Sequence, residues 1–72
     1  MTPTERLISV ILANRYTQVN VAEWATEANG GRPTAATVSR WANGITEPAP
    51  AVVKAIHDRF QAAGHDAVEG LV

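Results

Sequence analysis

The sequence predicts an all-α fold, a compact domain of four helices followed by a short C-terminal tail. Apolar residues recur at helical spacing in four separate segments. Each segment opens on a capping residue or a proline, and each fades at asparagine or glycine. We therefore assign residues 1–64 to a single helical domain and residues 65–72 to a tail with weak periodicity, expected to be loose or to be ordered by a partner.

The first helix is expected to begin after Thr2, with Pro3 in the first helical position. Glu5 stands where a capping box requires an acidic side chain, so the start is well marked. The helix is expected to fade near Asn14. Its predicted apolar stripe comprises Leu7, Val10 and Ile11, with Ile8 and Leu12 beside it.

The second helix is expected to begin at Asn20, with Glu23 completing a second capping box. Val19 and Trp24 occupy the two positions of a hydrophobic staple around this start. The helix is expected to stop at residues 29–31, Asn-Gly-Gly. Its predicted core residues are Val21, Trp24, Ala25 and Ala28.

Thr34 is expected to cap a third helix, which ends at Asn43 and Gly44 because glycine readily terminates helices. Pro50 can open a fourth helix, which ends at Gly64. The predicted core residues of these two helices are Val38, Trp41, Val52, Val53, Ile56, Phe60 and Ala63.

Composition narrows the possible functions. The 72 residues include no cysteine, which excludes disulfides and thiolate metal sites. Because 72 residues form one small domain, we expect no separate catalytic domain. No apolar stretch approaches the ~20 residues that span a membrane, and no signal peptide is recognisable, so a cytoplasmic protein is expected. The net charge is −1, but residues 32–59 carry four basic side chains against two acidic ones. That segment is best suited to face a polyanion.

The second helix, a glycine-bearing turn and the third helix form a helix-turn-helix pattern. With "VAEWA" in the second helix, "TAATVSRWANG" in the third and "NGITEP" after it, the chain resembles the phage-repressor and Cro-like DNA-binding domains over roughly residues 4–61. This resemblance implies a lambda-repressor-like fold and a transcription regulator that binds double-stranded DNA sequence-specifically as a homodimer. The protein would work in the host cytoplasm if it is encoded by a phage.

The resemblance also implies site residues. The helix at residues 34–43 would enter the major groove and contact base edges. These base contacts would come from Thr34, Ala35, Ala36 and Arg40. Alanine methyl groups can pack against the thymine methyl, and arginine can bind guanine with two hydrogen bonds. The phosphate contacts would come from Arg32, Thr37, Ser39, Asn43 and the backbone amides of Gly44 and Ile45.

The chain departs from the family pattern in its turn, which is longer by the residues Gly30, Gly31 and Arg32. This extension either alters the crossing of the two helices or loops outward and offers Arg32 to a phosphate. A dimer interface is expected on the fourth helix and the tail, where three apolar residues would otherwise be exposed. They are Val68, Leu71 and Val72.

In an alternative interpretation, the protein has the same fold but does not bind specific DNA. The helix-turn-helix would serve protein–protein interaction in an inhibitor, antitoxin-like or accessory protein, a use favoured by the acidic tail and the net charge. An enzyme is not expected, because neither Ser9 nor Ser39 lies in a nucleophile motif. His57 and His65 are eight residues apart on either side of a helix break, so no metal is expected. We also expect no cofactor and no small-molecule ligand.

Overall fold

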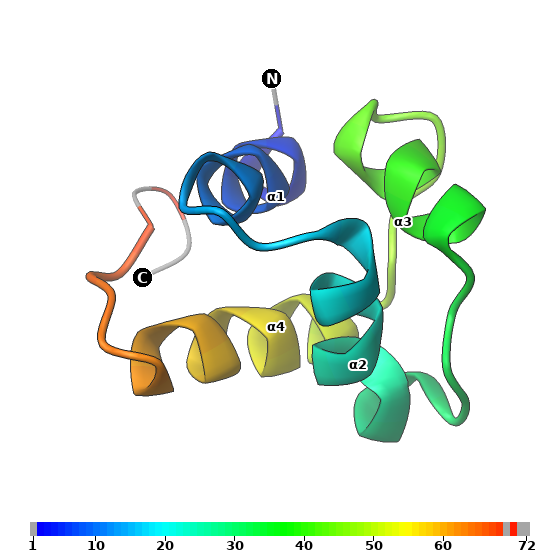
Figure 1. Cartoon of the computed structure of the whole chain (residues 1–72). Coiled ribbons are helices and arrows are strands. Elements are labelled where there is room, and N and C mark those ends of the chain that lie inside the picture. Colours follow the sequence, from blue (N-terminus) through cyan, green and yellow to red (C-terminus); the bar gives the residue numbers. More distant parts are fainter. Residues whose placement is uncertain (1, 69, 71–72) are drawn as a thin grey trace.

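A computed structural model describes residues 2–68 and 70 of the chain. Four helices follow one another: α1 (Pro3–Ala13), α2 (Gln18–Asn29), α3 (Ala35–Ala42) and α4 (Pro50–Ala62). Figure 1 shows α1 lying above α4, with α2 beside them and α3 at the outer edge. The Cα radius of gyration is 10.6 Å. The predicted compact all-α domain of four helices is confirmed.

The starts of α1 and α3 agree with the prediction. The Thr2 hydroxyl accepts a hydrogen bond from the Glu5 amide at 3.2 Å, and the Glu5 carboxylate accepts one from the Thr2 amide at 3.0 Å. Such a reciprocal pair satisfies two amide groups that the helix itself leaves without acceptors. At α3, the Thr34 hydroxyl accepts from the Thr37 amide at 3.1 Å. Pro50 opens α4 as predicted.

The predicted start of α2 is wrong. The helix begins at Gln18, and its N-cap is Thr17, three residues before the expected cap Asn20. The Thr17 hydroxyl accepts from the Asn20 amide at 3.3 Å, while the Asn20 side-chain oxygen accepts from the Thr17 amide at 2.9 Å. Asn20 is therefore the inner partner of the box. Val19 lies inside the helix and is 46% exposed, so it cannot form the predicted staple before the helix start.

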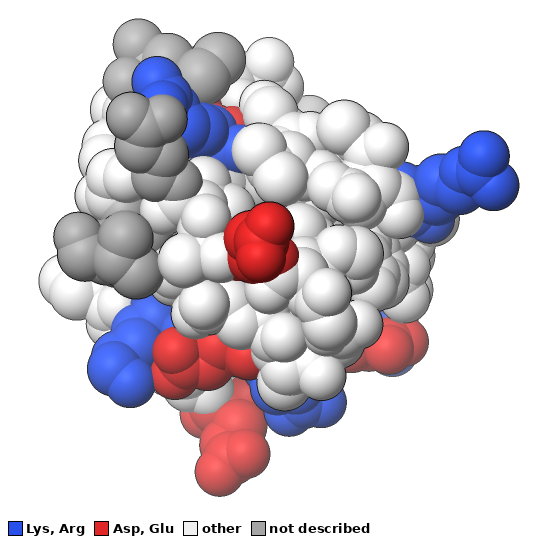
Figure 2. Space-filling model, turned by 90° about the vertical axis from the view of Figure 1, so that its left-hand side faces the viewer, with Lys and Arg blue, Asp and Glu red and all other residues white. Residues whose placement is uncertain are grey.

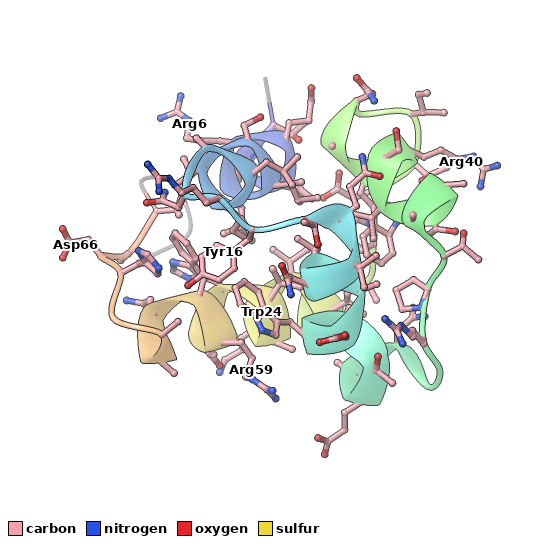
Figure 3. All side chains as sticks on the ribbon, viewed as in Figure 1. Arg6, Tyr16, Trp24, Arg40, Arg59 and Asp66 are labelled. Atoms are coloured by element: carbon pink, nitrogen blue, oxygen red, sulfur yellow. The ribbon has the colours of Figure 1, made fainter. Side chains whose placement is uncertain are left out.

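The four helices and Val68 share one apolar core. It comprises Leu7, Ile8, Ile11, Val21, Ala22, Ala25, Val38, Trp41, Val52, Ile56, Phe60 and Val68. Burying a side chain such as Phe60 contributes about 1.5–3 kcal/mol. Trp24 is half-buried and packs edge-on against Tyr16, with ring centroids 4.9 Å apart (Figure 3). Ala28 and Ala63 are exposed, contrary to the prediction, because they lie in the last turn of α2 and just beyond α4.

Residues 65–68 fold back onto the domain (Figure 1). Val68 is only 5% exposed within a single chain, and its amide donates to Nε2 of His57 at 3.0 Å. The expectation that Val68 offers a dimer surface is therefore wrong, because the residue already belongs to the core of its own domain. Leu71 and Val72, the other two residues of that prediction, lie outside the described residues.

Candidate functional site

Helix α3 presents one open face to solvent. Val38 and Trp41 are buried and anchor the helix. Ala36, Arg40 and Asn43 are exposed, and they share the opposite face because residues four and seven positions apart lie above one another on a helix. Figure 3 shows the Arg40 side chain pointing away from the body of the domain. The Arg40 guanidinium makes no hydrogen bond or ion pair with any described residue.

The first turn of α3 is open as well. Thr34, Ala35 and Ala36 are exposed. The hydroxyls of Thr34 and Thr37 lie 3.0 Å apart and bond to each other, which orders both side chains at the helix start. The amides of Ala35 and Ala36 precede the first repeating helical hydrogen bond, so this end of α3 carries donors and a partial positive charge.

The end of α3 uses most of its polar groups internally. The Asn43 side-chain amide donates to the Ser39 carbonyl at 2.8 Å. The Gly44 amide donates to the Trp41 carbonyl at 3.3 Å, and the Ile45 amide donates to the Arg40 carbonyl at 2.9 Å. With Gly44 in the left-handed conformation at φ 72°, this is a Schellman ending. Both amides predicted as phosphate contacts are thus engaged within the chain, while the Ile45 side chain is 71% exposed.

A carboxylate that the sequence pattern did not assign to the site lies beside this ending. A β-carbon built on Gly44 would lie 2.8 Å from Oε1 of Glu5. Hydrogen bonds from the backbone and side chain of Thr2 lower the pKa of Glu5, so the group is negatively charged at neutral pH. The capping box correctly identified Glu5 as a helix cap. Its contact with Gly44 leaves no sequence signal, because the two residues lie far apart in the chain.

Arg32 lies in the turn between α2 and α3, which begins at Gly30 in the left-handed conformation at φ 74°. Its guanidinium Nη2 is 3.3 Å from Oε1 of Glu23, and both side chains are 55% exposed. Exposed pairs of this kind contribute about 0–1 kcal/mol, so the guanidinium can readily exchange its partner. Pro33, directly after Arg32, is buried and fixes the turn to the domain.

The predicted site residues therefore gather on α3 and its two flanking turns, but their charges are few. Arg40 is the basic side chain on the open face, Arg32 is paired, and the Glu5 carboxylate adds a negative charge at the far end. The side of the molecule turned away from α3 has an acidic side chain near its centre, surrounded by uncharged residues, and both acidic and basic groups toward its margin (Figure 2).

Across residues 2–68 and 70, no three His, Cys, Asp or Glu side chains are grouped as metal ligands would be. The four helices described here are too short or too polar to cross a membrane. A cleft of about 630 Å³ opens between the start of α1, the segment before α4 and one face of α4.

The chain matches no protein-family model, no curated protein and no solved structure.

Proposed function

We propose that the chain is a repressor- or Cro-like helix-turn-helix protein that regulates transcription, using the helix at residues 34–43 to read the major groove of double-stranded DNA. The observation that carries this proposal is the open face of α3, where Arg40 has no partner among the described residues and is held on a helix anchored by Val38 and Trp41. The major groove is wide enough to admit an α-helix. The buried anchors would keep the helix rigid as its outer face met the bases.

Arg40 supplies the polar part of the readout. A guanidinium can donate two hydrogen bonds to O6 and N7 of guanine, a contact worth about 1–3 kcal/mol of discrimination against other bases. Because Arg40 gives up no internal ion pair on binding, the contact has no competing partner among the described residues. Arg40 is therefore the residue on which sequence specificity depends most.

Ala35 and Ala36 supply the apolar part. Both are exposed in the first turn of α3, where such helices approach base edges. A methyl group cannot hydrogen-bond, but it packs against the 5-methyl group of thymine and lets the backbone come close. We therefore expect thymine at the bases facing the first turn and guanine at the base facing Arg40.

Phosphate binding would begin at the N-terminal turn of α3, whose unpaired amides and partial positive charge favour anions. Arg32 joins by exchanging Glu23 for a phosphate. The Glu5 carboxylate opposes phosphate near Gly44, so we expect few ionic contacts and a shallow dependence of affinity on salt. Weak half-sites make a homodimer necessary, with its two reading helices about 34 Å apart, one turn of DNA.

The test is selection from a random double-stranded DNA library by the wild-type protein, repeated with Arg40→Ala. The wild type should enrich inverted half-sites one helical turn apart, and Arg40→Ala should lose the preferred guanine while keeping its helical circular dichroism. Arg59→Ala is the matched control, because it removes the same charge from an exposed position on α4 (Figure 3). Equal enrichment by wild type and a folded Arg40→Ala would refute the proposal.

The second candidate is a protein-binding module. It is favoured by the exposed Ile45, which directly follows Gly44, and by the negatively charged Glu5 beside Gly44, since an apolar and acidic surface suits a protein better than phosphates. In that case the folded wild type would enrich no DNA sequence. A binding partner would then lose affinity for Ile45→Ser and keep it for Arg40→Ala, the opposite ranking from the one expected for DNA.

A further inference from the structure

Two histidines hold the segment that follows α4 against the domain. Nε2 of His65 lies 2.8 Å from the Tyr16 hydroxyl, and its ring stacks on Phe60 with centroids 4.3 Å apart and an interplanar angle of 5°. Nε2 of His57, on α4, accepts the Val68 amide at 3.0 Å. His65 thus holds the beginning of the segment, and His57 holds Val68.

The His57 contact is compatible with only one protonation state. An imidazolium carries hydrogen on both ring nitrogens and has no acceptor, so the bond from Val68 requires a neutral ring with its proton on Nδ1. His57 is only 5% exposed. Protonation in place would bury a charge and leave the Val68 amide without an acceptor, and both changes are unfavourable.

The His65 contact is compatible with both states. A neutral His65 ring accepts from the Tyr16 hydroxyl, and a protonated ring donates to the same oxygen. Stacking on Phe60 also favours the cation, because an aromatic face attracts positive charge. The two histidines therefore differ in their response to acid, although both hold one short segment.

We propose that His57 is a proton-sensitive latch, which holds Val68 in the core while its ring is neutral and releases it when the ring is protonated. His65 keeps the beginning of the segment in place, so release is confined to the part around Val68. The effect has a definite sign. Acid favours the open latch, because protonation removes the acceptor that holds the Val68 amide, and higher pH favours the closed one.

The charges around the latch favour opening in acid. His57 lines the cleft beside α4 together with Glu47, Lys54 and Asp58. The Thr4 hydroxyl donates to the Glu47 carboxylate, and Lys54 pairs with Asp58 at 3.1 Å. The cleft is thus negative by one charge, and it would stabilise an imidazolium turned toward solvent.

The charged residues beside His65 differ from those beside His57. Arg6 and Asp66 are the charged side chains that line the hollow beside His65 and Val68. With one charge of each sign, they add no net attraction for a cation there. Protonation of His65 therefore changes little at this end, and the pH response of Val68 should follow His57.

The test is the hydrogen-exchange protection of the Val68 amide by NMR, measured from about pH 8 to about pH 5 and corrected for the intrinsic exchange rate. Protection should fall roughly tenfold or more across this range, while the Ile11 and Ile56 amides in the helices keep theirs. His57→Gln is the key variant, because its side-chain oxygen can accept the same bond but does not titrate. It should keep Val68 protected at both ends of the range.

His65→Phe is the matched control, because it keeps the stacking on Phe60 and should keep the pH response of Val68. If His57→Gln does not fold, the imidazole ¹⁵N shifts of the wild type show at which pH each histidine gains its proton, and these values are compared with the loss of Val68 protection. Loss of Val68 protection at the midpoint of the His57 titration supports the latch. Constant protection in the wild type, a midpoint that follows His65, or an undiminished response in a folded His57→Gln would overturn it.

Discussion

The carboxylate of Glu5 occupies the space beside Gly44 that any side chain at position 44 would need. A β-carbon there would lie 2.8 Å from Oε1 and 2.9 Å from Cδ of Glu5, and the Gly44 backbone has a φ of 72°. The start of α1 is thereby packed against the end of α3. Glycine is therefore required at position 44 for two reasons. The backbone there is left-handed, and Glu5 leaves no space for a β-carbon.

Gly44→Ala should therefore destabilise the domain by about 1–2 kcal/mol from the backbone conformation alone, with a further cost from displacing Glu5. Urea unfolding followed by circular dichroism measures the change. Gly31→Ala is the matched control, because a β-carbon at Gly31 meets nothing within 4 Å and its φ is not left-handed. It should be neutral or slightly stabilising. Equal losses in the two variants would contradict this account of Gly44.

The observed start of α2 gives a second prediction. The Thr17 hydroxyl accepts the Asn20 amide, so Thr17→Ala should cost about 1 kcal/mol of unfolding free energy. Thr46→Ala is the control, since Thr46 is exposed and lies outside the helices. Thermal unfolding would separate them, with Thr17→Ala melting several degrees lower. If the two variants melted at the same temperature, Thr17 would not be the effective cap.

Local signals explain what could be predicted of the fold. The capping box at Thr2, the proline at Pro50 and the glycine at Gly44 each act within a few residues, and the structure has all three as expected. The start of α2 was misplaced because two overlapping boxes compete there, Thr17 with Asn20 and Asn20 with Glu23. Only the packing of the complete domain decides between them.

Contacts between distant residues explain what could not be predicted. The open face of α3 follows from helical spacing alone, because Arg40 lies on the side of the helix opposite Val38 and Trp41. The approach of Glu5 to Gly44 and the bond from Val68 to His57 depend on how the helices and the tail pack. Neither contact leaves a periodic pattern or a motif. The tail is for this reason expected from sequence to be loose or to be ordered by a partner, although Val68 completes the core of its own domain.

The charge of Glu5 gives a prediction about pH. Hydrogen bonds from Thr2 lower the pKa of Glu5 below its usual 4.5, so the folded state favours the ionised carboxylate. The resulting stabilisation is present above the usual pKa and is lost as the pH falls through the lowered value. Glu5→Gln should therefore be less stable than wild type at pH 7, and the gap should narrow in acid. Urea unfolding at several pH values measures the gap, and a gap independent of pH would contradict the prediction.

The ion pair of Arg32 gives a prediction about the proposed DNA contact. Glu23 holds the guanidinium at 3.3 Å, so a phosphate must replace this carboxylate before Arg32 can bind it. Glu23→Gln removes the competitor and should tighten binding to a duplex taken from the library selection by a few-fold, consistent with the small worth of exposed pairs.

Glu27→Gln is the matched control for this effect. Glu27 is exposed on the same helix one turn further on, so its substitution changes the net charge equally without touching Arg32. Fluorescence anisotropy at two salt concentrations separates the local effect from the general one, because a released Arg32 adds a phosphate contact and steepens the salt dependence. A steeper slope for Glu23→Gln alone identifies Arg32 as a phosphate contact. Identical affinities and slopes for the two variants would mean that Arg32 does not reach the DNA and that only net charge matters.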